Sequence, residues 1–318
     1  MDRNEKIASI ICFMWLVNLT LGVSFIPNDL FIIILALTSI PMPIVLVVLV
    51  PLMFGDTDSS KNIEGIIVSD TDQTSIYLRE IIDDTKTEYI EICDNNRLSS
   101  IDLAPLENLS NLLVLNLSGN DLNSVDLSPL RNCVNLTELL IIGNNIREVN
   151  LAPLSACVSL KILNLAGNAI DVLDLRPLST CTKLEALILD GNQLANLDLS
   201  PLSACQNLRV LSLSNLNLQS IDLKPLIACT KLEGLVLSQN NLSSIDLSPF
   251  LQIGTLEYLD VTDNRLDKLD ITHLLRCLNL QTLRVDDIPL IQRVECLRPY
   301  SKGLGKHKGK IRHTYLEK

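Results

Sequence analysis

Leucines recur along most of this chain at a fixed spacing of 24 residues, without insertion or deletion. A second leucine follows each by three residues, so that each unit reads L-x-x-L-x-L-x-x-N-x-L. Fixed periods of about 20 to 50 residues are typical of solenoids, in which each unit buries its apolar side against its neighbours. The pattern therefore predicts a solenoid. The leading leucines are Leu112, Leu136, Leu160, Leu184, Leu208, Leu232, Leu256 and Leu280.

Each unit is expected to contain one short strand and one short helix. The two leucines of Leu163-Asn164-Leu165 have a period of 2, so they point to one face of a strand. The hydrogen-bond partners of such a strand must come from the adjoining units, which predicts a parallel sheet. On the return path, Ser128-Pro129 predicts a helix start, with the serine as the cap and the proline in the first turn.

Taken together, these positions strongly resemble the leucine-rich repeat family, and the cleanest copy is Leu160 to Lys183. The resemblance covers roughly Thr87 to Leu297. It implies an α/β solenoid that is curved, with parallel β-strands on its concave side and short helices on its convex side. Leucine-rich repeats also have a ladder of buried asparagines. The matching residues here are Asn96, Asn120, Asn144, Asn168, Asn192, Asn240 and Asn264.

Leu216 interrupts the series of asparagines, between Asn215 and Asn217. A buried amide at this position can pair with backbone groups that the turn leaves free, and leucine cannot. We therefore predict a local defect or a change of register at Leu216.

Two apolar runs without charged residues precede the repeats, at about residues 7–25 and 30–54. Each is long enough to cross a bilayer, which takes about 20 residues. Residues 26–29, Ile-Pro-Asn-Asp, suit a tight turn. We predict a membrane hairpin over residues 1–55, which contacts the lipid bilayer through residues 7–54.

The basic residues near these runs predict the orientation of the chain. Arg3 and Lys6 precede the first run and Lys61 follows the second, whereas the turn between them has no basic residue. Because basic residues favour the cytoplasmic side, the solenoid is expected in the cytoplasm of a multi-pass protein with two spans. If the first run were instead a cleaved signal peptide, one span would remain with the same final orientation.

Three further segments complete the predicted organisation. Residues 56–86 form an acidic linker and an N-terminal cap, with a short helix expected from Ser75 to Ile82. Residues 87–297 form the solenoid of 24-residue units, and residues 298–318 form a basic tail. The tail is open to three interpretations: a solvated end, a contact with anionic lipid, or a contact with acidic groups, either by folding back onto acidic residues of the last units or by touching a separate polyanion.

Most of the nine cysteines share one repeat position, which Leu109 and Ile253 occupy in other units. A position that accepts cysteine, leucine or isoleucine is apolar core, and free thiols favour a reducing compartment. Neither the cysteines nor the three histidines have metal-ligand spacing, so no metal is expected. The cysteines at this position are Cys133, Cys157, Cys181, Cys205, Cys229 and Cys277.

A column of aspartates stands two residues before the predicted helix starts. Such carboxylates can accept hydrogen bonds from nearby backbone N–H groups, and we prefer this interpretation to a calcium ladder because no dense oxygen cage surrounds them. The column contains Asp102, Asp126, Asp174, Asp198, Asp222, Asp246 and Asp270, with Asn150 in the same series.

No phosphate-binding loop and no nucleophile with a neighbouring base is found, so we expect neither an enzyme nor a cofactor. From Asp56 to Cys296 the chain has 33 acidic and 17 basic residues, a net charge of −16, which argues against nucleic-acid binding by the solenoid. A partner protein is expected instead on the concave face, whose middle is aliphatic. The contact residues we propose are Leu140, Ile142, Ile162, Ile188, Val210, Val236, Tyr258 and Asp260.

The sequence thus predicts a membrane-anchored scaffold for protein–protein interaction, with a partner on the concave face. The alternative is a receptor-like sensor with the solenoid on the extracellular side. A third hypothesis is a hydrolytic or transferase activity in the tail.

Overall fold

The computed structural model describes residues 65–68, 75–76, 86–93, 98–293 and 311–314. They belong to one compact unit. The hairpin expected over residues 1–55 lies outside these ranges, as does Asn96. Within the described ranges, no helix combines the length and the apolar character that a membrane crossing requires.

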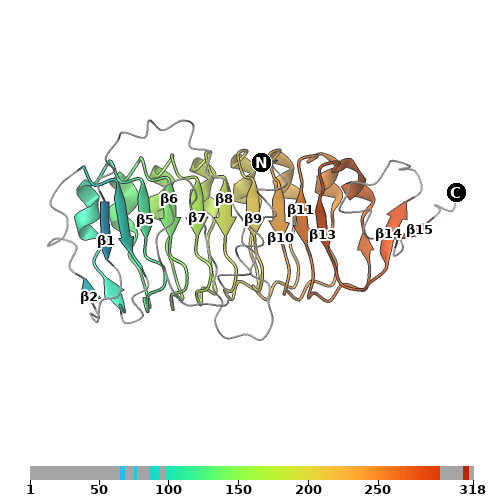
Figure 1. Cartoon of the computed structure of the whole chain (residues 1–318), viewed down its shortest axis with the longest axis horizontal. Coiled ribbons are helices and arrows are strands. Elements are labelled where there is room, and N and C mark those ends of the chain that lie inside the picture. The colour runs from blue at the N-terminus through green and yellow to red at the C-terminus, as the bar shows by residue number, and fades with distance from the viewer. Residues whose placement is uncertain (1–64, 69–74, 77–85, 94–97, 294–310, 315–318) are drawn as a thin grey trace, which may run out of the picture. The chain divides into compact units, whose positions relative to one another are not determined.

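The main sheet has ten parallel strands, in the order β1-β3-β5-β6-β7-β8-β9-β10-β11-β13 (Figure 1). From β5 onward each strand pairs with the strand 24 residues later, as Val114 does with Glu138 and Glu138 with Ile162. The period of the leucines is therefore the register of the sheet. The strands are β1 Gly65–Val68, β3 Tyr89–Ile92, β5 Val114–Asn116, β6 Glu138–Leu140, β7 Ile162–Asn164, β8 Ala186–Ile188, β9 Val210–Ser212, β10 Gly234–Val236, β11 Tyr258–Asp260 and β13 Thr282–Arg284.

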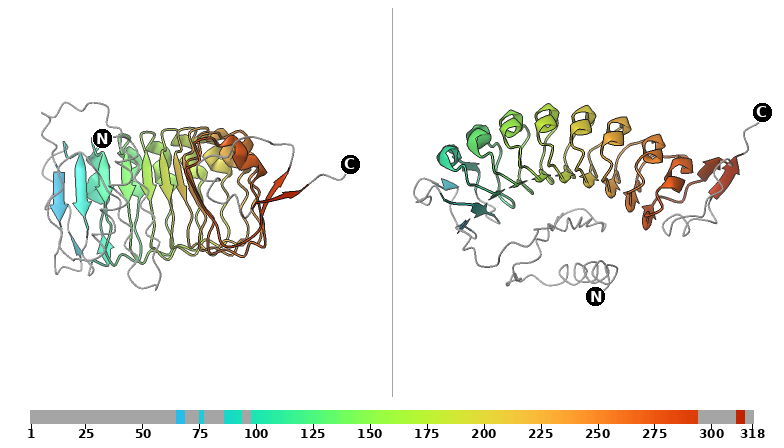
Figure 2. Two further views of the ribbon diagram at one scale, coloured as in Figure 1. Left: turned by 45° about the vertical axis from the view of Figure 1, so that its right-hand side comes forward. Right: turned by 90° about the horizontal axis from the view of Figure 1, so that it is seen from above.

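A 3₁₀ helix follows the strand in each regular unit, and these helices form the layer opposite the sheet (Figure 2). The strands lie on the inner side of the curved unit and the helices on the outer side, as expected for concave and convex faces. The helices are η1 Ala104–Asn108, η2 Ser128–Asn132, η3 Ala152–Ala156, η4 Arg176–Thr180, η5 Ser200–Ala204, η6 Lys224–Ala228, η7 Ser248–Leu251 and η8 Thr272–Arg276.

The aspartate column supports the start of these helices, and the prediction that Ser128 is the cap is wrong. The residue that precedes η2 is Leu127, and Ser128 is the first residue of the helix. The carboxylate of Asp126 accepts the Ser128 N–H at 2.9 Å and the Ser128 hydroxyl at 2.8 Å. These two bonds hold the pKa of Asp126 below its ordinary value. The same backbone bond forms at Asp102, Asn150, Asp174, Asp198, Asp222, Asp246 and Asp270.

The core lies between the sheet and the helices, and the cysteine column is part of it, as predicted. The six thiols are buried and free, and each lies near a backbone carbonyl oxygen of the preceding unit, as Cys157 Sγ does at 3.4 Å from the oxygen of Leu130. Burial raises the pKa of the Cys157 thiol to about 12, so the thiol stays protonated and unreactive near neutral pH.

Buried asparagines connect adjacent units by hydrogen bonds. The amide nitrogen of Asn168 donates to the carbonyl of Leu165 in its own unit, at 2.9 Å, and to that of Ile141 in the preceding unit, at 2.7 Å. Its amide oxygen accepts the Ile146 N–H at 3.3 Å. The corresponding bonds to two units also form at Asn192, Asn240 and Asn264.

The sheet keeps its register at Leu216, so the predicted change of register is wrong there. Strands β9 and β10 pair residue for residue, as Val210 does with Gly234. Two carbonyls that an asparagine at this position would have reached still receive a bond from a neighbouring rung. The oxygen of Leu189 accepts from Asn192 at 2.7 Å, and that of Leu213 accepts from Asn240 at 2.8 Å.

The local change at Leu216 is confined to the backbone conformation. Asn215 has a φ of 54° and Asn217 a φ of 64°. The conformation of Asn215 is regular, because the residue before the ladder asparagine also has a positive φ in the other units, where it is Gly119, Gly143, Gly167, Gly191, Gln239 or Asp263. The second left-handed residue is specific to this unit, and asparagine tolerates that conformation better than most residues.

Short strands at both ends of the solenoid differ from the predictions. At the N-terminal end, β2 Ser75–Ile76 pairs with β4 Ser100–Ile101, so the predicted helix does not begin at Ser75. Pairing with the next unit there outweighs the local helix signal. At the other end, β14 Leu290–Arg293 pairs with β12 Leu269–Asp270 and with β15 Ile311–Thr314. Residues 311–314 of the basic tail thus return to the last unit as a strand.

We predict that Asn168→Ala destabilises the chain by about 1–3 kcal/mol, because it leaves the buried carbonyl of Ile141 and the N–H of Ile146 without their ladder partner. Urea unfolding followed by circular dichroism measures this loss. Asn132→Ala is the matched control, since that exposed amide donates to the carbonyl of Glu107 at the surface. Its cost should stay below about 0.5 kcal/mol. Equal costs for the two variants would contradict a structural ladder.

Candidate functional site

The concave face is formed by the strand residues on either side of each core leucine. In β7, Leu163 points into the core, so Ile162 and Asn164 point to the opposite face of the sheet. Strand pairing places equivalent residues of successive units side by side, as Asn164 lies beside Ile188 and Ile188 beside Ser212. The concave residues proposed from the sequence therefore lie in continuous columns across the sheet.

The middle of these columns is buried, although the sequence predicted an exposed surface. The side chains of Ile162, Ile188 and Val236 are only 1%, 2% and 1% exposed, and those of Leu140 and Val210 are buried as well. Equivalent side chains of neighbouring strands are about 4.8 Å apart and therefore pack against one another. On the concave side, the curvature of the sheet brings them closer still. Toward the ends of the columns, Ile142 and Tyr258 are half-buried.

Three buried polar residues, Glu138, Asn164 and Asp190, lie among these aliphatic side chains. The Asp190 carboxylate accepts the Ser212 hydroxyl at 2.7 Å and the Ser214 N–H at 2.6 Å. Burial raises the pKa of Asp190 to about 6 in spite of these bonds. Sequence reasoning included these residues in the columns and missed their role. The sequence signal that could have indicated this role is a polar residue in an otherwise aliphatic column.

The polar groups of Glu138 and Asn164 have fewer favourable contacts than the carboxylate of Asp190. Burial raises the pKa of Glu138 to about 7, although the positive charge of Lys161 acts in the opposite direction. The amide oxygen of Asn164 accepts the Ala166 N–H at 3.0 Å, while its amide nitrogen is buried without an acceptor in the described part of the chain. Such a donor costs free energy unless it finds an acceptor.

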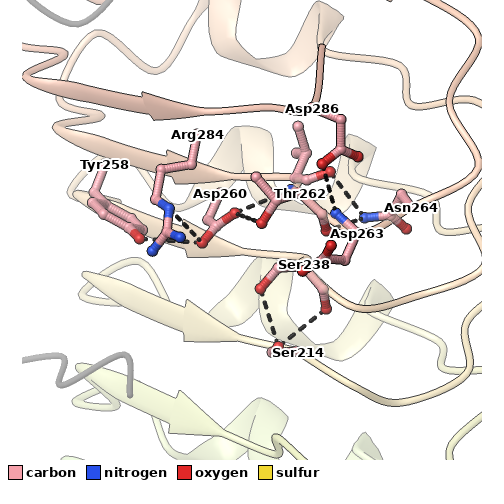
Figure 3. A network of polar contacts seen from close by, with 10 residues as sticks. Ser214, Ser238, Tyr258, Asp260, Thr262, Asp263, Asn264, Arg284 and Asp286 are labelled. Atoms are coloured by element: carbon pink, nitrogen blue, oxygen red, sulfur yellow. Dashed lines mark hydrogen bonds and ion pairs between the residues drawn. The ribbon is translucent and has the colours of Figure 1, made fainter. Parts of the chain in front are cut away.

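The C-terminal end of the concave face holds a polar network around Asp260 (Figure 3). The Asp260 carboxylate is fully buried and accepts bonds from the Thr262 N–H at 3.0 Å and the Thr262 hydroxyl at 2.7 Å. Its other oxygen lies 3.3 Å from the Tyr258 hydroxyl and 3.5 Å from Arg284 Nε. Burial and the nearby carboxylate raise the pKa of Tyr258 well above its usual range.

This network brings together the two predicted contact residues Tyr258 and Asp260 and adds Arg284, whose side chain is 39% exposed. Beside it, Asp286 accepts the backbone N–H of the exposed Asp263 at 3.1 Å (Figure 3). The end of the face is thus polar and partly exposed, and its middle is aliphatic and buried. Within the described residues, no group of histidine, cysteine, aspartate or glutamate side chains has the arrangement of a metal site.

Comparisons with known proteins relate this arrangement to one family. The family model described as "Leucine rich repeat" matches residues 134–194 and 206–266. The chain is 31% identical to internalin C2 from Listeria monocytogenes, with a TM-score of 0.52, and the match covers 62% of this chain and 80% of that one. No curated protein sequence gives a significant match.

Two further solved structures are similar in fold alone. The functional domain of InlJ from Listeria monocytogenes, which includes a cysteine ladder, is 21% identical with a TM-score of 0.51 over 68% of this chain and 47% of that one. The leucine-rich repeat ectodomain of the Arabidopsis thaliana receptor kinase GASSHO1/SCHENGEN3, in complex with CASPARIAN STRIP INTEGRITY FACTOR 2, is 19% identical with a TM-score of 0.56. That match covers 72% of this chain and 29% of the ectodomain, so the chain spans less than half of either structure.

We predict that Glu138→Gln stabilises the chain at pH 8 by up to about 3 kcal/mol and has little effect at pH 4. Because folding raises the pKa of Glu138, the folded state binds more protons than the unfolded state between about pH 4.5 and about pH 7. Stability from this group is therefore present at low pH and lost as the pH rises through about 7. Chemical unfolding at a series of pH values measures the difference.

The control for this pH dependence is Asp126→Asn. The exposed Asp126 has a lowered pKa, so its contribution has the opposite sign and is lost as the pH falls. If the free energy of unfolding of Glu138→Gln equalled that of the parent chain at every pH, burial would not raise the pKa of Glu138.

Proposed function

The chain belongs to the leucine-rich repeat family, and from this premise we propose that it is a membrane-held scaffold that binds a protein partner on the concave face of its sheet. Repeats of this family generally serve as protein-interaction modules rather than as enzymes. The observation that carries the proposal is the unbroken register of the sheet, which joins the columns of successive units into one surface.

The composition of the concave face indicates the chemistry of the partner. The middle offers branched aliphatic side chains such as Ile162, Ile188 and Val210, which favour an apolar segment. The C-terminal end offers the phenol of Tyr258 and the guanidinium of Arg284, two residue types that often contribute most to binding at interfaces. The complex of the plant receptor ectodomain with another protein is a precedent for partner binding on this fold.

The membrane part of the proposal is supported by the sequence. The two uncharged runs, 7–25 and 30–54, have the length of spans, and the basic residues flank them on one side. The column of free, buried thiols is compatible with a reducing compartment and therefore with a cytoplasmic solenoid. A contact of the basic tail with anionic lipid would add to the attachment.

Charging the concave face should abolish partner capture. We expect Ile188→Asp combined with Val210→Asp to reduce capture of the cross-linked partner at least tenfold, since two charges would be buried at the contact. Pull-down from cells with a cross-linker measures this. Val134→Asp combined with Val172→Asp, at two exposed valines outside the concave columns, is the control for added charge and should keep capture intact. Because Ile188 and Val210 are buried, circular dichroism must show that the concave variant keeps its fold. Undiminished capture by the concave variant would exclude this face.

Protease treatment of intact cells tests the orientation. A cytoplasmic solenoid should resist a protease added outside and be digested only after the membrane is permeabilised. Immunoblotting against the repeats reads the result, and a known surface protein serves as the positive control. Digestion without permeabilisation would instead favour the receptor-like sensor with an extracellular solenoid.

A further inference from the structure

The C-terminal end of the concave face differs from the middle in being both polar and partly exposed. Asp263 is exposed, and Thr262 and Asp286 are half-buried. This part of the face, which we call the polar end, consists of Tyr258, Asp260, Thr262, Asp263, Arg284 and Asp286 (Figure 3). A ligand can therefore contact the polar end without displacing core side chains.

The hydroxyl groups in this region already use their protons within the protein. Thr262 donates to Asp260 Oδ1 at 2.7 Å, and Tyr258 donates to Asp260 Oδ2 at 3.3 Å. The raised pKa of Tyr258 keeps its hydroxyl protonated. Two units earlier, the half-buried Ser214 donates to the carbonyl of Ser238 at 3.0 Å. Because a hydroxyl has one proton and two lone pairs, these groups offer a ligand only lone pairs.

The carboxylates of the polar end outnumber its cations. Arg284 is its one basic residue, and the Arg284 Nε lies 3.5 Å from the Asp260 carboxylate. Asp286 accepts the Asp263 N–H at 3.1 Å, which brings these two aspartates together. Among the described residues, no cation forms an ion pair with Asp263 or Asp286. The polar end therefore carries an excess of negative charge and of hydrogen-bond acceptors.

The turn that follows each strand adds polar side chains on the same half of the solenoid. The residue before the ladder asparagine has a positive φ throughout, a conformation that favours glycine. This residue is Gly119, Gly143, Gly167 or Gly191 in the N-terminal units and Asn215, Gln239 or Asp263 in the C-terminal units. The C-terminal units thus present a row of polar side chains where the N-terminal units present only backbone.

We propose that the polar end anchors the protein partner by binding an arginine or lysine side chain of that partner. Both side chains have N–H donors and no acceptor, so they match a surface of lone pairs and carboxylates. The bonds to Asp263 and Asp286 would be charge-assisted, which makes them stronger than bonds between neutral groups. Arg284 is a precedent within the chain, because its guanidinium lies against the Asp260 carboxylate.

The charge of the whole solenoid favours the same kind of partner. Residues 56–296 have 33 acidic and 17 basic residues, and such an excess speeds the encounter with a basic segment. This inference rests on the proposed function, since it requires a protein partner on the concave face. It adds the chemistry of the residue that the partner places at one end of that face.

Photo-crosslinking in cells that express the full chain identifies what lies at the polar end. The probe is p-benzoylphenylalanine in place of the half-buried Thr282, which lies beside Tyr258 on the neighbouring strand. Mass spectrometry of the cross-linked peptide gives the sequence of the partner at the contact. We expect an arginine or lysine within about four residues of the cross-linked position, because an extended chain spans about 3.5 Å per residue.

Removing the two free carboxylates should weaken the contact. Asp263→Asn combined with Asp286→Asn keeps side-chain oxygens that accept hydrogen bonds, and asparagine tolerates the positive φ of residue 263. We expect this variant to lower the cross-linking yield at least tenfold. Circular dichroism of the purified chain checks that the fold is kept.

The matched control is Asp171→Asn combined with Asp267→Asn. These two aspartates are exposed and share one repeat position, 11 residues after Leu160 and Leu256, outside the concave strands. The control removes the same charge as the double variant of the polar end. Its cross-linking yield should equal that of the parent chain.

Three results would overturn the inference and leave the proposed function in place. A cross-linked partner segment without a basic residue would show that the anchor is not a cation. An unchanged yield after Asp263→Asn and Asp286→Asn would show that these carboxylates do not hold the partner. Absence of a cross-link at residue 282, in a chain that still captures a partner, would place the contact elsewhere.

Two other results would also contradict the inference. A cross-link to residues 298–318 of this chain, or to a second copy, would mean that the basic tail or another molecule of the protein occupies the polar end. A chain that captures no partner at all would contradict the proposed function, and the inference would fail with it. Capture by the parent chain therefore distinguishes the two failures.

Discussion

The constraint on which this structure depends is that equivalent groups in adjacent units are one another's partners. The strand of one unit completes its hydrogen bonds only with strands 24 residues away, as Leu139 pairs with Leu163. The ladder amide of Asn168 and the thiol of Cys157 each reach a carbonyl 27 residues back. From β5 onward these ladders share one period, so a residue inserted in this stretch would shift the strand, the asparagine and the cysteine relative to their partners. This explains the uninterrupted spacing.

The features that depend only on this period could be predicted from the sequence. The leucine core, the buried cysteine column and the aspartates that bind backbone N–H groups all follow from a position that repeats. Features that depend on neighbours in space could not be predicted from the sequence. The break at Leu216 is tolerated because each nearby carbonyl has two possible amide donors, and Ser75 forms a strand because Ser100 lies beside it. A linear pattern contains neither fact.

On the concave face, even less of the structure could be predicted from the sequence. The columns through Ile162 and Ile188 could be read from the sequence, because side chains alternate along a strand. Their burial could not, since exposure depends on what lies across the sheet. The raised pKa values of Glu138 and Asp190 have the same origin, because desolvation depends on the three-dimensional surroundings of a side chain and not on its position in the repeat.

The difference between the two faces of the sheet bears on function. The core face is built from leucine at every unit, and a permanently buried layer gains most from such uniform apolar packing. The concave face is equally buried at its middle and yet carries Glu138, Asn164 and Asp190. Burying an ionised carboxylate or an unpaired amide costs free energy, so the concave face is less stable when buried than an all-aliphatic surface would be. The two faces of the sheet are therefore chemically distinct, because the core face is uniformly apolar and the concave face combines apolar and polar groups, as interaction surfaces do.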